Sequence, residues 1–497
     1  MQVHKQKKAL LLRLRNPEQV ETVIPKAKTF DYKGSKLTAV PHDLDTVKVL
    51  SNLGMKPPSP IQYHYKWSGM YKPFEAQEKT AAFLTMNRRA FVLNDLGTGK
   101  TLSTLWAYDY LKKIGQVNKL LVVSPLSTLE RVWADEIFGH FPHLTYAVLH
   151  GTRKKREALL KTEADVYIVN HDGVKVLQDE LAKRDDIDII VVDEISQCAR
   201  NASTDRWKAL KKVTAKIGWL WGLTGTPIPN DPTDAWAQCR LVVPDNVPPY
   251  FTRFRDTVMR QAGPYKWIPR DNALQTVEQA MQPSIRFHRS DCIDLPPLMY
   301  QTRQVPLSKQ QQSMYNEMLK HLTAEHEGEQ IQAVNEAVKL MKLVQIACGT
   351  AYSMDKEIVV VEPTERLNTL EELIQESNSK TIVFAPFTAT VEMIAEHLRN
   401  KGMRVGVIYG GINKSQRDRT FHEFQKADEL DVLVAQPAAM SHGLTLTAAS
   451  TIVWFAPITS AETYEQANAR ITRPSQKHSQ LIVNIEGSAV ERRIYDK

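Results

Sequence analysis

Short apolar runs alternate with stretches of helical spacing in two regions, residues 71–245 and about 378 to the end. Several runs are continuous and β-branched, as in Ile189–Val192, which is typical of a parallel sheet covered by helices on both faces. The predicted strands are Phe91–Leu93, Leu120–Val123, Tyr146–Leu149, Val166–Val169, Ile187–Val192 and Trp219–Leu223, then Thr381–Phe384, Arg404–Ile408, Val432–Ala435, Thr451–Phe455 and Gln480–Ile485. The pattern predicts an α/β protein with two doubly wound parallel-sheet lobes.

Two regions interrupt this alternation. Residues 1–70 contain short β-like pieces, Leu10–Leu14 and Thr46–Leu50, separated by Pro and Gly. They form either a small accessory module or a solvated leader packed on the next domain. Residues 246–345 are Pro-rich at first and then helical, clearest at Gln310–His321 and Ile331–Cys348. The predicted domains are therefore an N-terminal module (1–70), a first lobe (71–245), helical protrusions with the crossing between lobes (246–345) and a second lobe (346–497).

The charge balance points to a polyanionic partner. The net charge is +8, and the first 36 residues hold nine Lys and Arg against three acidic residues. By itself this is weak evidence, because many basic proteins bind no nucleic acid. The four cysteines are far apart and have no metal-binding spacing, which is typical of reduced thiols. With no signal peptide and no bilayer-length apolar run, we expect a soluble, cytoplasmic protein, or a nuclear one in a eukaryote.

A candidate phosphate loop, Asn94–Thr101, follows the first predicted strand and precedes a predicted helix. Gly97 and Gly99 let backbone N–H groups approach phosphate oxygens at a helix N-terminus. Lys100 would reach the β- and γ-phosphates, and the Thr101 hydroxyl would bind Mg²⁺. The strict pattern has glycine where Asn94 stands, so an accidental turn is the alternative.

Two acidic residues, Asp193 and Glu194, follow the continuous apolar strand Ile187–Val192. Ligands of open parallel sheets bind at this carboxyl end of the strands. Asp193 could hold Mg²⁺, and Glu194 could polarise the water that attacks a nucleotide. Such pairs are more often solvated turns, but the phosphate loop of the same sheet favours the catalytic interpretation.

Two further segments carry polar groups that fit this chemistry. Thr224, Gly225 and Thr226 follow another strand and could couple γ-phosphate to the second lobe, although a plain β-turn has the same composition. On a helix, Gln466, Arg470 and Arg473 would share one face. Arginines there could neutralise charge on the γ-phosphoryl group, whereas a solvated basic face is the alternative.

Taken in order, these segments resemble Swi/Snf-type ATPases, the duplex-DNA translocase branch of the superfamily-two helicases. The resemblance covers about residues 71–497. Its motifs are Pro73–Gln77, Asn94–Thr101, Leu121–Ser127 with Trp133, Ile168–His171, Asp193–Ser196, Leu223–Asn230 with Trp236, Ile285–Arg289 with Leu295–Pro297, Thr381–Phe387, Tyr409–Gly411, Ser441–Ala449 and Gln466–Arg473. Motif II ends in Ile195-Ser196 where the family usually has Ala-His, and Thr445 stands where Asn is usual.

The resemblance implies two RecA-like lobes that hydrolyse ATP with Mg²⁺ and move along the backbone of double-stranded DNA. It assigns catalysis to Lys100, Asp193, Glu194, Arg470 and Arg473, and Mg²⁺ to Thr101 and Asp193. Nucleotide binding falls to Gln77, Gly97, Thr98, Gly99, Lys100, Thr101 and Gln466. Coupling falls to Thr224, Gly225, Thr226 and Gly443, and DNA contact to Ser127, Asn170, Ser441 and His442.

Two alternatives remain at this point: a strand-separating superfamily-two helicase and a non-catalytic DNA-binding scaffold. The first needs a wedge element that the sequence does not reveal. The second conflicts with retention of Lys100, Asp193, Glu194, Arg470 and Arg473. We expect a monomer in which residues 1–70 could bind a protein partner or target. The compact build is similar to stand-alone bacterial or phage members of the family.

Overall fold

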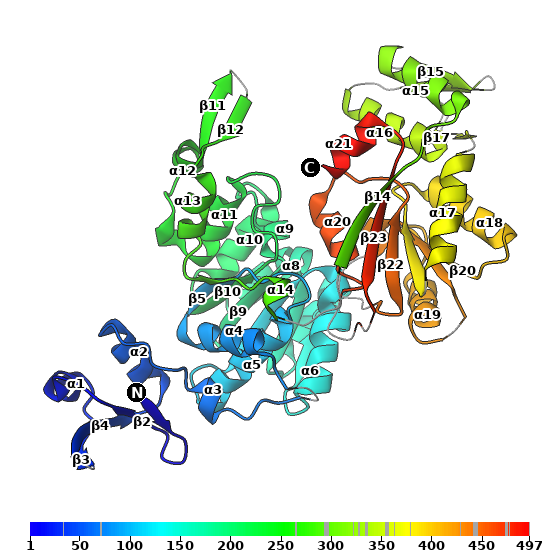
Figure 1. The fold of residues 1–497 in the computed structure, drawn as a ribbon. Helices are drawn as coiled ribbons and strands as arrows, with labels where there is room; N and C mark the ends of the chain where they lie inside the picture. Colours follow the sequence, from blue (N-terminus) through cyan, green and yellow to red (C-terminus); the bar gives the residue numbers. More distant parts are fainter. Residues whose placement is uncertain are drawn as a thin grey trace. The chain divides into compact units, whose positions relative to one another are not determined.

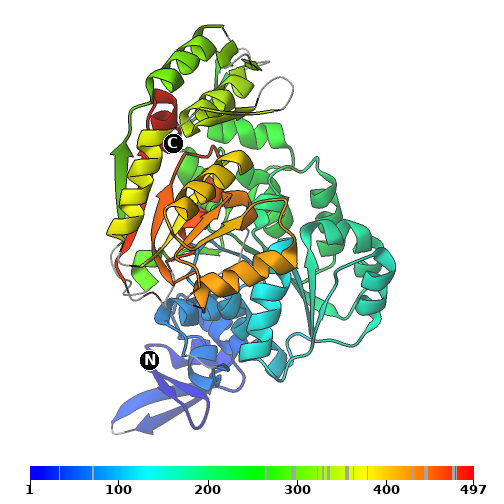
Figure 2. The same cartoon turned by 90° about the vertical axis from the view of Figure 1, so that its right-hand side faces the viewer.

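A computed structural model describes residues 1–497 except 33, 70–71, 264–265, 293–297, 322, 327–328, 333–335, 353–356, 362, 378, 428, 441–445, 473–475, 477 and 497. The chain divides into two compact units, Met1–Ile293 and Asp294–Lys497. Each unit is built around one large parallel sheet, which Figures 1 and 2 show from two directions.

The sheet of the first unit has the strand order β13-β5-β10-β9-β6-β8-β7, and every pair in it is parallel. Its strands are β5 (Arg89–Val92), β6 (Lys119–Ser124), β7 (Tyr146–Val148), β8 (Val166–Asn170), β9 (Ile187–Asp193), β10 (Trp219–Leu223) and β13 (Ser284–Ile285). All six strands predicted for this lobe are confirmed. Only β13, an edge strand of two residues, was not expected.

Successive residues of these strands enter different hydrophobic cores, which explains their continuous apolar sequence. In β6, Leu120 and Val122 pack with α4 (Glu75–Met86) and α5 (Lys100–Lys113). Leu121 and Val123 pack in the other core, with residues of α8 (His171–Leu181), α10 (Asp205–Thr214) and α11 (Asp234–Val242). Helices therefore cover both faces of the sheet, as predicted.

The second unit repeats this architecture with the parallel order β14-β23-β22-β19-β21-β20. The strands are β14 (Leu298–Gln304), β19 (Lys380–Phe384), β20 (Val405–Ile408), β21 (Val432–Ala435), β22 (Ala449–Trp454) and β23 (Gln480–Glu486). One core packs against α17 (Thr364–Glu376) and α18 (Thr388–Asn400), and another against α19 (Lys414–Gln425) and α20 (Ala461–Asn468). The five strands predicted for this lobe are confirmed.

A small sheet at the N-terminus precedes the first lobe. Its antiparallel order is β1-β2-β4-β3, with β1 (Gln2–His4), β2 (Ala9–Leu12), β3 (Lys28–Tyr32) and β4 (Ser35–Pro41). Helices α1 (Pro17–Val23) and α2 (Leu44–Asn52) pack on it, and α3 (Ile61–His64) follows. The sheet and its helices share a hydrophobic core, against which Met86 of α4 also packs. That residues 1–70 are a separate accessory module stays a prediction.

Two local predictions are wrong. Thr46–Leu50, expected to be β-like, lies within α2, because the Asp43 side chain accepts a hydrogen bond from Thr46 N at 2.8 Å and caps the helix. The helix expected at Ile331–Cys348 begins only at Glu336, as α16 (Glu336–Cys348). Residues Glu329–Gln332 form β16, which pairs with β15 (Thr323–His326).

The region 246–345 contains strands as well as helices. Helix α12 (Phe251–Val258) leads into the hairpin of β11 (Met259–Gly263) and β12 (Lys266–Pro269), followed by α13 (Ala273–Ala280) and α14 (Arg289–Cys292). In the second unit, α15 (Lys309–His321) matches the predicted helix, and β17 (Thr350–Tyr352) pairs with β18 (Ile358–Val360).

The four-domain division remains a prediction. No helix in the described part of the chain has the length and apolar character needed to cross a membrane.

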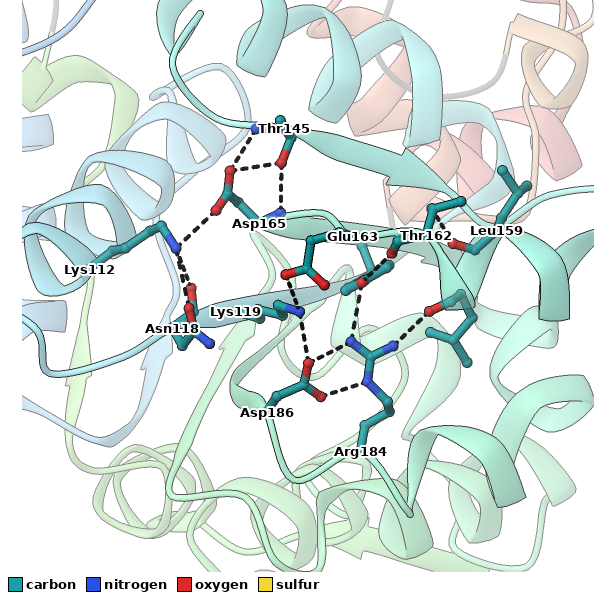
Figure 3. A network of polar contacts seen from close by, with 12 residues as sticks. Lys112, Asn118, Lys119, Thr145, Leu159, Thr162, Glu163, Asp165, Arg184 and Asp186 are labelled. Atoms are coloured by element: carbon teal, nitrogen blue, oxygen red, sulfur yellow. Dashed lines mark hydrogen bonds and ion pairs between the residues drawn. The ribbon is translucent and has the colours of Figure 1, made fainter.

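A polar network ties the strands of the first sheet together at their amino ends (Figure 3). Lys119, which begins β6, is buried, and its Nζ lies 2.7 Å from Glu163 and 2.8 Å from Asp186. Arg184 donates two hydrogen bonds to Asp186, at 2.6 and 2.7 Å, and one to Leu160 O at 2.6 Å. The Arg184 guanidinium, and then Lys119, hold the pKa of Asp186 well below its usual range.

We expect Asp186→Asn to destabilise the first unit, because it leaves buried Lys119 with one acidic partner fewer. Asp186 is 38% exposed, so water screens the interaction and the loss should be about 1–3 kcal/mol. Denaturant unfolding followed by tryptophan fluorescence measures it, since eight of the nine tryptophans lie in this unit.

The destabilisation caused by Asp186→Asn should depend on pH, in the direction set by the lowered pKa of Asp186. A depressed carboxyl pKa stabilises the fold above the ordinary Asp value of about 3.9, and the contribution is lost as pH falls below it. The difference between wild type and Asp186→Asn should therefore be constant near neutral pH and shrink below about pH 4. Asp179→Asn, which breaks an exposed pair with Lys212, is the control and should cost under about 0.5 kcal/mol. An equal effect of both substitutions would contradict this account.

Candidate nucleotide site at the carboxyl edge of the first sheet

The carboxyl ends of three adjacent strands bring the predicted motifs together. In the register of the sheet, Leu223 at the end of β10 pairs with Val92 of β5 on one side and with Asp193 of β9 on the other. Thr224 N also donates to Val92 O at 3.0 Å. The phosphate loop, the acidic pair and the Thr224 turn thus share one edge of the sheet.

The phosphate loop connects β5 to α5 through two glycines with left-handed backbone. Gly97 has φ 84° and Gly99 has φ 79°, a region that L-residues with side chains rarely adopt. A Cβ on Gly99 would also lie 2.0 Å from Gln77 Nε2. Gly99 is the residue before α5, so the loop leads directly into the helix N-terminus. The backbone therefore has the shape of an anion cradle.

Lys100, the first residue of α5, is buried and folds back over this loop. Its Nζ donates to Asn94 O at 2.9 Å and to Asp95 O at 3.3 Å. Thr98 is also buried, and its hydroxyl donates to Asp95 O at 2.8 Å, while Thr101 follows Lys100 in the first turn of α5. The ammonium group thus lies within the cradle where phosphate oxygens could replace the carbonyl partners.

Asn94, which stands where the strict pattern has glycine, braces the loop. Its Nδ2 donates to Thr80 Oγ1 of α4 at 2.9 Å, and its Oδ1 accepts from Phe287 N at 3.0 Å. The side chain is buried and joins three parts of the chain. Gln77, also in α4, is buried against Gly99, and its Oε1 accepts from Phe74 N at 3.1 Å.

Asp193 ends β9 as a buried carboxylate with two donors. Trp133 Nε1 donates to its Oδ2 at 3.0 Å, and Glu194 N donates to its Oδ1 at 3.1 Å. Burial raises the pKa of Asp193, while the charge of Lys100 opposes that rise. His171 donates from Nε2 to Asp193 O at 2.9 Å, and burial lowers the pKa of His171 to about 4.

These residues fit a divalent cation. A buried carboxylate is costly without a positive partner. The Asp193 carboxylate oxygens and the Thr101 hydroxyl are hard oxygen ligands of the kind that Mg²⁺ prefers. In the described part of the chain there is no cluster of three His, Cys, Asp or Glu residues that would hold a metal by protein ligands alone. Mg²⁺ in nucleotide sites is usually bound through one or two protein oxygens together with phosphates.

Glu194 has a strained backbone and is buried. Its φ of 47° and ψ of 49° lie in the left-handed region, where residues other than glycine are uncommon. Such strain costs of order 1–3 kcal/mol and occurs preferentially at functional sites. The turn separates the end of β9 from the short helix α9 (Ile195–Cys198).

A direct hydrogen bond joins the acidic turn to the Thr224 turn. Ser196 and Thr224 are both fully buried, and their hydroxyl oxygens lie 2.9 Å apart. Thr224 Oγ1 also accepts from Thr226 N at 3.2 Å. Gly225 lies close to the phosphate loop, since a Cβ there would be 3.5 Å from Asn94 O and from Leu96. Ser196, the unusual ending of motif II, thus supplies a link between motifs.

Sequence reasoning gave no role to four residues that support the site: Thr80, Asn94, Trp133 and His171. Their contacts join elements 14–193 residues apart in sequence. Asn94, Trp133 and His171 were noted only as positions within motifs, and Thr80 was not noted. A lone polar or aromatic residue in a helical segment carries no signal of such a contact.

The structure describes only some of the residues predicted to contact DNA or to act as catalytic arginines. Asn170 is buried, and its Oδ1 accepts from Arg156 Nη1 at 2.9 Å. Ser127 lies in a short 3₁₀ turn, Leu126–Thr128. Ser441, His442, Gly443 and Arg473 lie outside the described residues.

The expectation of one helix for Gln466, Arg470 and Arg473 is wrong. Helix α20 carries Gln466 but ends at Asn468, whose Oδ1 accepts from Trp454 Nε1 at 2.8 Å. Beyond it, Arg470 O accepts from Leu446 N at 3.1 Å, and this contact draws the backbone out of the helical path. Arg470 is buried.

Two family models match consecutive parts of the chain. A model described as the SNF2-related domain matches residues 44–353, and one described as the helicase conserved C-terminal domain matches residues 365–475. Protein p41 of Acyrthosiphon pisum secondary endosymbiont phage 1 is 28% identical over 408 residues, covering 78% of this chain and 86% of the phage protein. An uncharacterized ATP-dependent helicase of Mycoplasma genitalium is 23% identical over 412 residues.

The match to the mycoplasma helicase covers 81% of this chain but only 38% of that protein. Among solved structures, the Sulfolobus solfataricus SWI2/SNF2 ATPase core in complex with dsDNA has a TM-score of 0.43 and 20% identity. That match covers 86% of this chain and 91% of the archaeal chain.

Two parallel-sheet lobes, the first with a phosphate loop beside strand-end carboxylates, define a helicase-like ATPase. The chain belongs to the SNF2-related family, whose domain model spans most of its length. The resemblance inferred from the motifs is confirmed, as are the fold class and the ATP-hydrolysing class of enzyme.

Proposed function

We propose that this protein is an ATP-dependent translocase on double-stranded DNA that moves along the backbone without separating the strands. The observation that carries the proposal is the shared sheet edge, where Lys100, Asp193 and the Thr224 turn meet at the ends of β5, β9 and β10. Membership of the SNF2-related family and the net charge of +8 support a duplex partner held through its phosphates.

In this proposal the first lobe binds the triphosphate. The loop amides and Lys100 offset the charge of the β- and γ-phosphates. Mg²⁺, when bound by Thr101 and Asp193, supplies further charge stabilisation to the phosphate oxygens. Glu194 orients the water that forms the new bond to the γ-phosphorus and accepts its proton, while the bond to the β-phosphate oxygen breaks.

The second lobe completes the chemistry in this proposal. Arg470 and Arg473 offset the charge that develops on the transferred phosphoryl group, and Gln466 contacts the nucleotide. Hydrolysis then changes how the lobes hold the DNA backbone, with Ser127, Ser441 and His442 as contacts and Gly443 and the Thr224 turn as coupling elements. Such backbone contacts carry little sequence information.

A pair of strand assays tests the proposal. We expect ATP-dependent displacement of a third strand from a DNA triplex, which requires movement along the duplex, and no release of a strand from a forked duplex. Release from the fork would establish the helicase alternative. Binding of duplex without either activity, together with absent ATP turnover, would establish the scaffold alternative.

One structural feature keeps strand separation as a second candidate. The β11–β12 hairpin extends from α12 (Figure 1) and carries the exposed residues Arg260 and Lys266. Its Trp267 is partly buried, because the ring packs against the core of the first lobe, with the Arg255 guanidinium 3.9 Å away. An exposed cationic hairpin has the charge to hold the phosphates at a junction between strands. If the fork assay is positive, Arg260→Gln with Lys266→Gln should abolish strand release while leaving triplex displacement intact.

We expect Ser196→Ala to weaken the coupling between DNA binding and ATP turnover. The change removes the Ser196 hydroxyl from the buried Thr224 hydroxyl, which keeps its bond from Thr226 N, and so loosens the link between two turns of the site. Coupling energies of about 0.5–2 kcal/mol correspond to a fall of about 2- to 30-fold in the ratio of duplex-stimulated to basal turnover. Ser203→Ala, at an exposed serine, is the control. An equal fall in both rates would show that Ser196 only stabilises the site.

A further inference from the structure

The N-terminal sheet has helices on one face only. Leu10, Leu12 and Val40 point to this covered face and are at most 1% exposed. They pack with Val20 and Ile24, from α1 and the residue that caps it, and with Val47 and Leu50 of α2. In Figure 1 both helices lie on the same side of the dark blue strands.

The other face carries the alternate residues of the same strands, because side chains point to opposite sides at successive positions. We call it the open face, and its residues are Gln2, His4, Ala9, Leu11, Lys28, Phe30, Tyr32, Ser35, Leu37, Ala39 and Pro41. None of them is buried. A sheet face with exposed apolar residues is unusual in a protein without a ligand there.

Two aromatic rings dominate this face. Phe30 and Tyr32 of the edge strand β3 are 42% and 54% exposed. They are two residues apart on one strand, so they lie side by side about 7 Å apart along it. Leu37 pairs directly with Phe30 across the sheet, and Lys28 precedes the two rings on the same face.

The charge around the open face is strongly positive. Nine basic against three acidic residues give the first 36 residues a net charge of +6, out of +8 for the whole chain. Lys5, Lys7 and Lys8 are exposed in the turn between β1 and β2, and Arg13 and Arg15 are exposed after β2. Such a surface is complementary to an anion with flat apolar groups.

We propose that the open face binds single-stranded nucleic acid, with bases stacked on Phe30 and Tyr32 and phosphates against the surrounding lysines and arginines. Exposed aromatic rings in a basic surface are the features by which proteins bind unpaired strands. Duplex bases are stacked on one another and are not available to these rings, so a duplex would be held by charge alone, without the contribution of stacking. An acidic protein would satisfy the charge but not the paired planar rings.

This site is separate from the ATPase machinery. Residues 1–43 precede the region that the SNF2-related model matches, and the face uses none of the motifs of the nucleotide site. The inference therefore does not rest on the proposed translocase activity. A single-strand anchor beside the motor would direct the protein to DNA that contains gaps, tails or forks.

The test measures binding by fluorescence anisotropy with the full chain, without nucleotide and at one fixed salt concentration. The probes are labelled oligothymidine, oligouridine and a duplex of the same length. The variant is Phe30→Thr with Tyr32→Thr, since threonine keeps the strand propensity of β3 and both side chains are exposed. Because each stacked base contributes about 5- to 150-fold, we expect at least tenfold weaker binding of single strands.

Three controls make the outcome decisive. Tyr146→Thr removes a 37% exposed aromatic residue from β7, an edge strand of the larger sheet, and should leave binding unchanged. Lys28→Gln should reduce the slope of log affinity against log salt concentration for single-strand binding, by the amount expected for the loss of about one phosphate contact. Duplex-stimulated ATP turnover should be the same in wild type and the Phe30, Tyr32 variant.

If the Phe30, Tyr32 variant binds only oligothymidine more weakly than wild type does, the ligand of the open face is single-stranded DNA. If it binds only oligouridine more weakly, the ligand is RNA. Unchanged affinity for both, or equal losses for single strands and duplex, would overturn the proposal. Loss of ATP stimulation with intact single-strand binding would count against it as well, because it would show that these residues serve the motor.

Discussion

Lys100→Ala should reduce ATP turnover with saturating duplex DNA to the background of the assay. Lys100 is the buried cation of the phosphate loop, with its ammonium 2.9 Å from Asn94 O and 3.3 Å from Asp95 O. In the proposed mechanism this group offsets charge that grows on the phosphate oxygens during transfer. Removing one such preorganised donor typically costs about 10²–10³ in rate. Phosphate release under steady-state conditions measures the loss.

The matched control is Lys112→Ala, near the other end of the same helix. Lys112 lies in the last turn of α5 and pairs with Asp165 at 2.9 Å, within the polar network that Figure 3 shows. Its removal should lower stability slightly and leave turnover within about twofold of wild type. Normal turnover by Lys100→Ala would show that Asn94–Thr101 is not the phosphate loop.

Arg473→Ala should slow ATP hydrolysis by about 10³- to 10⁵-fold while leaving ATP affinity nearly unchanged, if it acts as an arginine finger. The reason is that a finger stabilises charge that develops only in the transition state, so its loss lowers kcat more than binding. Single-turnover hydrolysis and equilibrium binding of a fluorescent ATP analogue separate the two effects. Arg470→Ala should show a similar pattern with some loss of stability, since Arg470 is buried.

Arg419→Ala is the control in the second unit. Arg419 is 81% exposed on α19 and pairs with Glu423 one turn further along the same helix, so its loss should change neither rate nor affinity. If Arg473→Ala weakened ATP binding as much as turnover, the arginine would bind the ground state. If it changed neither, the second lobe would not contribute this residue to hydrolysis.

The strands of both lobes could be predicted because their signal, a short run of consecutive apolar residues, is contained in the local sequence. A β-branched run such as Ile189–Val192 is buried on both faces of the sheet, and four consecutive β-branched residues favour a strand over a helix. Thr46–Leu50 was predicted to be β-like because Val47 and Val49 alternate with polar residues. That pattern suits a strand as well as a helix. The helix is stabilised by the Asp43 cap and by the burial of Val47 and Leu50 on one side of it.

The site could be predicted only as far as its motifs reach. Lys100, Asp193 and the Thr224 turn were placed at one sheet edge, because the carboxyl ends of parallel strands coincide. The contact of Trp133 with Asp193 joins a helical segment to a strand 60 residues later, and that geometry is set by packing. The end of α20 at Asn468 likewise follows from contacts with Trp454 and Leu446 rather than from local spacing.

The most direct test of the central claim is the steady-state ATPase rate of the wild-type chain with duplex DNA, single-stranded DNA and RNA as separate effectors. A translocase on duplex DNA predicts that saturating duplex raises turnover about tenfold or more above either single-stranded effector, with a salt dependence typical of phosphate contacts. Stimulation by RNA equal to that by duplex, or turnover indifferent to every nucleic acid, would contradict the account.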